Sequence, residues 1–202
     1  MGGSSYHLSL GKVRGYPGSQ GPMRPLTDDE TKVFFEKLSK YIGRNIEYLI
    51  DRKEEPHCFR LIKDRVYYMS EMLARQAASF PKEKIMCVGV CFGKFTKGGA
   101  FRLHVTALEY LAQFATFKAW IRPQSEMSYL YGNHLLKGHV AKMTEGVPEH
   151  QGMVILNCKD VPLGFAVSAK SGAQISNLDG SAIAAFHQAD IGEYLRDEET
   201  LF

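Results

Sequence analysis

Long apolar runs and paired cysteines are both missing from this sequence. No stretch approaches the roughly 18 consecutive apolar residues that a membrane-spanning helix needs. The first residues also lack the basic, apolar and small-residue pattern of a secretory signal. The four cysteines form neither a disulfide framework nor the paired C-x-x-C spacing of a zinc site. We therefore expect a globular protein of a reducing compartment, with packed thiols at Cys58, Cys87, Cys91 and Cys158.

Catalytic signatures are missing as well. Gly93-Lys94 does not complete the phosphate-binding motif G-x-x-x-x-G-K-[ST]. Val88 occupies the position of its first glycine, and Phe95 occupies the position of the magnesium-binding hydroxyl. The chain has no G-x-S-x-G and no H-E-x-x-H motif. His134 and His139 are five residues apart, a spacing that does not place two ligands on one helix face. The sequence therefore predicts a non-enzyme with no catalytic residue, no metal site and no cofactor.

The net charge is small for a protein that binds nucleic acid. It is +3 over 202 residues, whereas a protein that holds RNA tightly by itself is usually more basic, because phosphate binding is largely electrostatic. Residues 23–116 carry 16 basic and 12 acidic side chains, a net +4, and residues 117–202 carry 7 and 10, a net −3. The excess of acidic residues lies near the end of the chain, where Arg196 is outnumbered by Asp190, Glu193 and Asp197–Glu199. We interpret Asp197–Glu199 as a solubilising tail, with contact to a basic protein neighbour as the alternative.

Residues 1–22 are rich in glycine and serine, have no periodicity and precede an internal methionine, Met23. We expect a vector-derived or disordered extension there and leave it out of the fold. The first domain is expected over residues 23–116. Thr27 and Glu30 have the spacing of a capping box, which predicts the start of a helix that ends at Gly43. Asn45–Ile50 is expected to add a second short turn.

Strand-favouring aromatic and β-branched residues then predict an antiparallel sheet. His57–Ile62 and Arg65–Met69 are expected to form a hairpin, and Ser70 to cap a helix that runs to about Ser79. That helix should turn Leu73, Ala77 and Phe80 inward. The other expected elements are a strand over Lys84–Cys91 continuing toward Phe95, a turn at Gly98-Gly99, a strand over Ala100–Val105 and a helix capped by Thr106. The predicted fold class is an α+β domain, an antiparallel sheet with about three helices.

The second domain, residues 117–202, is predicted to be a small, mostly β barrel. Large and small residues alternate over Pro162–Lys170, which is typical of a tightly curved strand. A short helical turn is expected over Asn133–Lys137, bracketed by Gly132 and Gly138, with Gly138 as its stop signal. The other strands are expected over Lys118–Arg122, His139–Thr144, Met153–Asn157 and Ala182–Gln188.

Two constellations of basic residues could contact RNA. Lys118, Trp120 and Arg122 share one strand face, which places an aromatic ring between two cations and could stack a base. The alternative is that the single tryptophan fills a core or domain seam. Around the Gly98-Gly99 turn, a second cluster is predicted either to touch RNA or a partner or to be a solvated hairpin. Its members are Lys94, Lys97, Arg102 and His104.

The order of several motifs resembles a known family. The motifs are Met23–Thr27, Gly93–Lys97, Phe101–His104, Tyr131–His134, Pro162–Phe165 and Gln188–Tyr194. Together they resemble the nuclear-import-seven family of assembly factors for the large ribosomal subunit, over everything from Met23 to Phe202. Residues 128–143 are similar to the opening of a PUA domain, a small RNA-binding barrel. Ala141 and Ala166 depart from the resemblance, since the family commonly carries glycine at both positions.

The resemblance implies more than the residues do by themselves. It implies that a helix with its following loop, together with a later strand edge, forms the RNA face. The residues so implied are Lys137, His139, Lys142, Lys170, His187 and Gln188. Exposed bases offer edges and faces that a duplex hides, so single-stranded or distorted RNA is the expected target.

We therefore expect a monomeric, non-catalytic RNA-binding assembly factor for the large (60S) subunit that supports pre-rRNA processing. The resemblance implies the nucleus and nucleolus, with the cytoplasm as a second location. It also implies partners in the pre-60S particle, among them an FtsJ-type RNA methyltransferase and exosome components. The alternatives are an RNA-modifying enzyme or its accessory subunit, and a protein-only adaptor.

Overall fold

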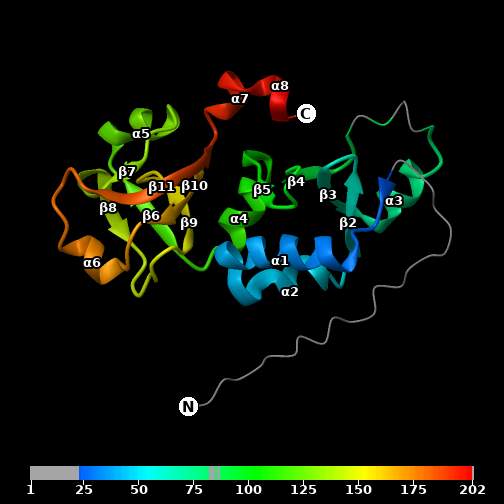
Figure 1. Ribbon diagram of the computed structural model, residues 1–202, viewed down its shortest axis with the longest axis horizontal. Helices are drawn as coiled ribbons and strands as arrows, with labels where there is room; N and C mark the ends of the chain where they lie inside the picture. The colour runs from blue at the N-terminus through cyan, green and yellow to red at the C-terminus, as the bar shows by residue number, and fades with distance from the viewer. Residues whose placement is uncertain (1–22, 82–84, 86, 202) are drawn as a thin grey trace, which may run out of the picture.

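The computed structural model describes residues 23–81, 85 and 87–201, and it has two lobes, each built around one sheet (Figure 1). The extension expected over residues 1–22 lies outside the described residues. In the first sheet the strands follow chain order and every neighbouring pair is antiparallel. These strands are β1 (Met23–Arg24), β2 (His57–Ile62), β3 (Arg65–Ser70), β4 (Val90–Phe95) and β5 (Phe101–Leu103).

Helix α1 (Asp28–Ile42) covers one face of this sheet and begins where the sequence predicts. The Thr27 hydroxyl accepts the Glu30 N–H, and the Glu30 carboxylate accepts the Thr27 N–H, so the capping box is confirmed. Gly43, at φ 54°, ends the helix as predicted. The short turn that follows is also confirmed, as the 3₁₀ helix η1 (Gly43–Ile46) and α2 (Glu47–Ile50).

The core of the first lobe is aromatic. Phe34 of α1 is fully buried and meets Phe101 of β5 edge-on, with ring centroids 5.0 Å apart. Phe59 and Phe92 complete the contact from β2 and β4. Each such ring removes a large apolar area from water, and edge-to-face pairs contribute a further 0.5–1.5 kcal/mol or so. This packing holds β5, and with it the β4–β5 hairpin, rigidly against α1.

Helix α3 (Glu71–Ala77) is shorter than predicted. Ser70 caps it by accepting the Leu73 N–H, and Ala77 is buried, both as expected. The inward orientation predicted for Leu73 and Phe80 is wrong, because these side chains are 38% and 57% exposed. A helix of two turns buries only one narrow face, and here the small Ala74 and Ala77 occupy that face.

The strand predicted over Lys84–Cys91 begins only at Val90, so this prediction is largely wrong. Lys84 and Met86 lie outside the described residues. Gly89 has φ +75°, and a Cβ there would lie 2.4 Å from the Tyr68 carbonyl oxygen. The left-handed backbone at Gly89 ends any extended conformation before β4.

The turn and return strand of the β4–β5 hairpin are confirmed, whereas the cap predicted at Thr106 is wrong. The Thr106 hydroxyl donates a hydrogen bond to the Cys91 carbonyl of β4 instead of capping a helix. A 3₁₀ turn, η3 (Val105–Ala107), contains this residue, and α4 (Leu108–Phe114) follows. Thr106 therefore links the segment after β5 to β4 through this hydrogen bond.

The second lobe is a nearly closed sheet with the order β7-β11-β10-β9-β6-β8. Its β6–β9 pair is parallel and its other pairs are antiparallel. The predicted fold class, an α+β domain followed by a small, mostly β barrel, is confirmed. The strands are β6 (Lys118–Ile121), β7 (Leu135–Leu136), β8 (Val140–Met143), β9 (Gly152–Leu156), β10 (Pro162–Ser168) and β11 (Ile183–Asp190).

The helix predicted over Asn133–Lys137 is wrong. The helix of this region is α5 (Pro123–Leu130), with proline in its first turn, where a missing N–H costs nothing. Its glycine stop is Gly132, at φ +85°, rather than Gly138. The next residues form β7 and a 3₁₀ turn, η4 (Lys137–His139), which links the two edge strands of the barrel.

The two lobes share one hydrophobic core. Tyr41 of α1 meets Phe165 of β10 with ring centroids 5.4 Å apart, and both side chains are buried. Gly152 permits this approach, because a Cβ there would lie 2.7 Å from the Tyr41 ring. Barrel residues such as Val154 and Leu156 belong to the same buried cluster as Phe34. Among the described residues, no helix is both long and apolar enough to cross a bilayer.

The chain end returns from the barrel to the first lobe through α7 (Glu193–Arg196) and α8 (Glu198–Leu201) (Figure 1). Leu201 is only 2% exposed and belongs to the shared core. Its carbonyl accepts a 2.7 Å hydrogen bond from the Arg65 guanidinium of β3. Although Asp197–Glu199 are exposed, this segment is more than a solubilising tail, because Leu201 anchors it on the first sheet.

Candidate nucleic-acid interface

Strands β6 and β8 place Trp120 directly opposite Lys142. The Lys142 ammonium lies 5.0 Å from the centre of the indole ring, a cation–π distance. The indole N–H donates a 2.6 Å hydrogen bond to Asp160, which fixes the orientation of the ring. Trp120 is partly buried. Its ring packs against the hydrophobic core that the two lobes share, and part of the residue remains exposed to solvent.

The turn η4 extends this row of residues along the same edge of the sheet. The Arg122 N–H donates to the His139 carbonyl at 2.9 Å, which places the end of β6 beside the turn. Lys137 and Lys142 both line a groove of about 410 Å³ between β8 and α6 (Gly172–Ser176). We call Trp120, Arg122, Lys137, His139 and Lys142 the β8 edge surface. Lys118 lies on β6 next to this surface, on the same strand face as Trp120.

The other three barrel residues predicted to touch RNA lie elsewhere. Lys170 follows β10 and is exposed, and Gln188 is exposed on β11. The His187 ring points inward, where it packs against Tyr129 at a centroid distance of 5.1 Å and bonds Asp190 at 2.6 Å. With 12% of its side chain exposed, His187 offers little surface to a ligand.

Asp190 is the centre of an internal polar network. Its fully buried carboxylate meets His187 at 2.6 Å, Arg196 at 2.8 Å and the Gly192 N–H at 2.7 Å. Burial alone would raise the pKa of Asp190, but the hydrogen bonds from His187, Arg196 and Gly192 outweigh it and hold the pKa below its usual value. The sequence analysis counted Asp190 only among the acidic residues near the chain end and did not predict its burial.

His187, Asp190 and Glu193 are also the one group in the described part of the chain whose ligand atoms could surround a metal ion, all within 4.8 Å. The carboxylates of this group already accept hydrogen bonds. Asp190 accepts from Arg196 and from the Gly192 N–H, and Glu193 accepts from the Asp190 N–H at 3.2 Å. A guanidinium within hydrogen-bond distance opposes a second cation. We therefore interpret this group as an ion-pair network that fastens α7 to β11.

The cluster predicted on the first lobe stays together in the structure. Lys94 of β4 is paired directly with Arg102 of β5, and Lys97 is exposed in the turn between them. His104 follows β5 and is half-buried, and its Nδ1 atom has no hydrogen-bond partner among the described residues. Burial, helped by the charges of Arg65 and Lys94, lowers the pKa of His104 to about 4. His104 is therefore neutral at pH 7.

The titration of His104 predicts a specific pH dependence of stability. The unfolded chain binds a proton on this histidine below about pH 6.5, whereas the folded protein does so only near pH 4. Lowering the pH through this window therefore favours unfolding. We expect the free energy of unfolding, measured with urea, to fall less between pH 6.5 and 4 in His104→Gln than in the wild type. The exposed His150→Gln is the control, and parallel curves for wild type and His104→Gln would refute the prediction.

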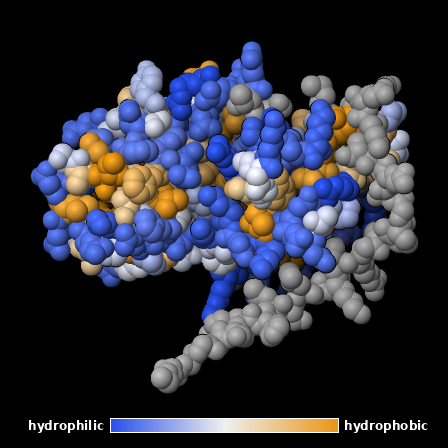
Figure 2. Space-filling view, in the orientation of Figure 1, coloured by the Kyte–Doolittle hydropathy of each residue, from blue (hydrophilic) through white to orange (hydrophobic). Residues whose placement is uncertain are grey.

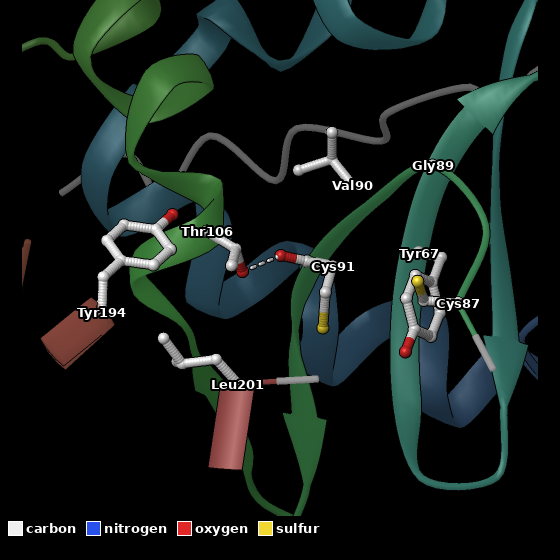
Figure 3. A pocket seen from close by; sticks show the side chains of 8 residues that line it. All are labelled: Tyr67, Cys87, Gly89, Val90, Cys91, Thr106, Tyr194 and Leu201. Atoms are coloured by element: carbon white, nitrogen blue, oxygen red, sulfur yellow. Dashed lines mark hydrogen bonds between the residues drawn. The ribbon is translucent and has the colours of Figure 1, made fainter. Parts of the chain in front are cut away.

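An apolar cleft of about 220 Å³ lies under the chain end (Figure 3). The cleft is lined by Tyr194 of α7 and Leu201 of α8, and on the side of the first sheet by Tyr67, Val90 and Cys91. Burial raises the pKa of the Cys91 thiol, as expected for a packed cysteine. The packed environment predicted for Cys87 and Cys158 is wrong, because both are exposed.

A separate apolar band lies over β11 on the barrel lobe (Figure 2). Ile183 and Phe186 are its exposed members, and His134 meets the Phe186 ring edge-on at 5.5 Å. Sequence reasoning missed this band and two other features, the α6 wall of the groove and the Asp160 partner of Trp120. Asp160 could not have been found from a local pattern, because 40 residues separate it from Trp120.

Two family models cover most of the chain. Residues 23–105 match the NIP7/UPF0113 pre-PUA domain, and residues 117–199 match the UPF0113 PUA domain. The chain belongs to the NIP7/UPF0113 family. The resemblance seen in the sequence is thereby confirmed, and the β8 edge surface lies on the family's PUA domain.

Curated relatives of the family are similar to this chain over nearly their full length. The 60S ribosome subunit biogenesis protein nip7 of Schizosaccharomyces pombe is 58% identical over 89% of this chain and 100% of its own. The 60S ribosome subunit biogenesis protein NIP7 of Saccharomyces cerevisiae is 58% identical over 89% of this chain and 99% of its own. The homolog of Mus musculus is 54% identical over 89% and 99%.

Solved structures support the fold. A PUA domain protein from Aeropyrum pernix superposes with a TM-score of 0.59 at 14% identity, covering 89% of this chain and 91% of its own. A conserved PUA domain protein from Thermoplasma acidophilum has a TM-score of 0.52 at 14% identity, with 87% and 98% covered. At 14% identity these two structures show similarity of fold alone. The aligned region covers most of this chain and therefore both lobes.

Proposed function

We propose that this chain is a non-catalytic, RNA-binding assembly factor of the large (60S) ribosomal subunit. The observation that carries the proposal is the 58% identity, over nearly the whole length, to yeast proteins named for 60S subunit biogenesis. The PUA domain match and the cations of the β8 edge surface support RNA as the ligand. Single-stranded or distorted pre-rRNA is the proposed target, in support of pre-rRNA processing.

The β8 edge surface has the chemistry for such a ligand. Trp120 offers part of an aromatic face, and stacking on an aromatic ring contributes about 1–3 kcal/mol per base without sequence preference. Lys137 and Lys142 line the neighbouring groove and can neutralise phosphates. The barrel is close to neutral as a whole, so binding by it alone should be modest and sensitive to salt. Protein partners in the particle would raise the effective concentration of the RNA.

The proposal extends to partners and location. We propose contacts with other factors of the pre-60S particle, including an FtsJ-type RNA methyltransferase and exosome components, and residence in the nucleolus and nucleus. The apolar band over β11 and the exposed apolar residues of α3 give the chain surfaces for protein contacts. An RNA-modifying enzyme and a protein-only adaptor are the competing functions.

RNA binding can be tested by titrating the full chain with a labelled single-stranded RNA at several salt concentrations. Wild type should bind, with an affinity that falls as salt rises. Replacing both Lys137 and Lys142 with alanine should lower the slope of log affinity against log salt by about 1.4, at roughly 0.7 per phosphate contact. The matched control replaces the exposed Lys32 and Lys53 with alanine. Absence of binding at low salt would favour the adaptor, and an unchanged slope would remove these lysines from the interface.

A further inference from the structure

Strand pairing on the first lobe brings several cations together. Lys94 of β4 pairs with Arg102 of β5, and on its other side Lys94 pairs with Arg65 of β3. Three adjacent strands therefore carry cations at one level of the sheet, within about 10 Å, given a strand spacing near 4.8 Å. Like charges directly opposite each other destabilise a sheet. Arg65 already donates to the Leu201 carbonyl, so it is not counted as available.

The turn of this hairpin adds a third cation, because Lys97 is exposed between β4 and β5. We call Lys94, Lys97 and Arg102 the hairpin cluster. None of the ion pairs found within the described residues involves any of these three. The fold thus holds several like charges together with no carboxylate at ion-pair distance from them among the described residues.

Protection of a sheet edge does not explain this arrangement. β5 is an edge strand, and a charged side chain such as Arg102 there discourages pairing with another molecule. Lys94, however, lies on the second strand, which is already paired on both sides. Its position opposite Arg102 protects no edge and only adds repulsion. An external anion would relieve that repulsion.

We propose that the hairpin cluster binds the phosphate backbone of RNA, as a second contact of the chain separate from the β8 edge surface. A lysine ammonium beside a guanidinium fork is a common phosphate-binding pair. The exposed glycine turn at Gly98-Gly99 lets a backbone approach closely. This inference rests on the proposed RNA-binding function and extends it to the first lobe.

An acidic protein segment is the competing ligand, and the surface favours RNA. Protein interfaces are usually anchored by buried aromatic or apolar side chains. Among the described residues, the exposed large apolar side chains come from other places, and the hairpin from residue 94 to residue 102 contributes none. A polar, cationic surface suits a sugar–phosphate backbone. Joining it to the barrel in one chain would strengthen binding of an RNA that reaches both.

The experiment compares three full-length double variants with wild type. Lys94→Gln/Arg102→Gln alters the hairpin cluster, Lys137→Gln/Lys142→Gln alters the β8 edge surface, and Lys32→Gln/Lys53→Gln is the charge-matched control. Each is titrated over a salt series with a labelled, mixed-sequence single-stranded RNA, and separately with polyglutamate. We expect the hairpin variant to bind RNA about tenfold more weakly, with a salt slope lower by about 1.4 than that of the control. Its thermal midpoint should not fall, because the change removes a repulsion.

The outcomes separate this inference from the proposed function. If the β8 edge variant weakens RNA binding while the hairpin variant equals the control, the inference is wrong and the proposed function stands. If wild type binds no RNA, both are wrong. If the hairpin variant loses polyglutamate binding and keeps RNA binding, the ligand is an acidic protein. A lowered thermal midpoint in the hairpin variant would show that the two cations stabilise the fold, which also contradicts the inference.

Discussion

Replacing Asp190 with alanine is expected to lower the free energy of unfolding by about 4 kcal/mol. The Asp190 carboxylate is fully buried and is matched by Arg196, by His187 and by the Gly192 N–H. Removing it leaves the Gly192 N–H and the His187 ring without their partner and takes the ion-pair partner away from Arg196, whose side chain is 32% exposed. The loss should be visible as a lower urea midpoint with an unchanged m-value.

Two further variants test whether the charge pair is the cause. Arg196→Ala should also destabilise, and the double variant Asp190→Ala/Arg196→Ala should lose less than the sum of the two by roughly 1–3 kcal/mol. Glu198→Ala removes an exposed acid of the same segment and should be nearly neutral. Additive single losses would show that the pair has no coupling energy.

The same residue predicts how stability responds to acid. The folded-state pKa of Asp190 lies below the usual value of 3.8. Its contribution is therefore fully present above the unfolded pKa and is lost as the pH falls through the folded value. The acid limb of the stability curve below about pH 4 should be shallower in Asp190→Ala than in the wild type.

Gly93→Ala is expected to cost about 3 kcal/mol of unfolding free energy, because strain and a backbone clash act together. Gly93 has φ 152°, and an added Cβ would lie 2.0 Å from the Arg102 carbonyl oxygen and 2.9 Å from the Leu103 Cα. Neither contact can be relieved by a rotamer change, since both involve backbone atoms. β4 and β5 would have to separate, which would also displace Lys94 from Arg102.

The control for this prediction lies in the same hairpin. Gly98 has an ordinary φ, and an added Cβ would find its nearest atom, the Thr96 hydroxyl oxygen, at 4.0 Å. Gly98→Ala should therefore stay within about 0.5 kcal/mol of wild type in the same chemical denaturation assay. Equal losses in the two variants would mean that flexibility of the turn, and not the approach of β4 to β5, decides the effect.

Local signals predicted the elements whose causes are local. The Thr27 capping box, the β2–β3 hairpin and the barrel strands other than β7 lie where the local sequence patterns predict them. The region before β7 shows how such reading fails. Gly132 and Gly138 both could end a helix, and the sequence alone favoured Gly138, although Pro123 marked the true start of a helix that ends before Gly132.

The candidate RNA-binding residues and the Asp190 network also divide into features that local patterns predict and features that depend on the packing of distant segments. The shared face of Lys118 and Trp120 follows from the two-residue period of a strand and needed no structure. The position of Lys142 over the Trp120 ring depends on the register between β6 and β8, which a single sequence does not display. Likewise, Asp190 looks like one more acid near the chain end until β11 and α7 bring His187 and Arg196 to it.

By itself, the sequence determined the two-part α+β and β-barrel plan, the starts of α1 and α3, the family, and the residues from which an RNA-binding surface could be built. The tertiary structure decided which cations stand together, that Asp190 is buried, and that Leu201 fastens the chain end to the first sheet. The physical reason is the sequence separation over which the interacting residues act. Caps and alternation arise from neighbours within one turn or strand, whereas charge clusters and buried pairs require the strand register that forms only when distant segments pack.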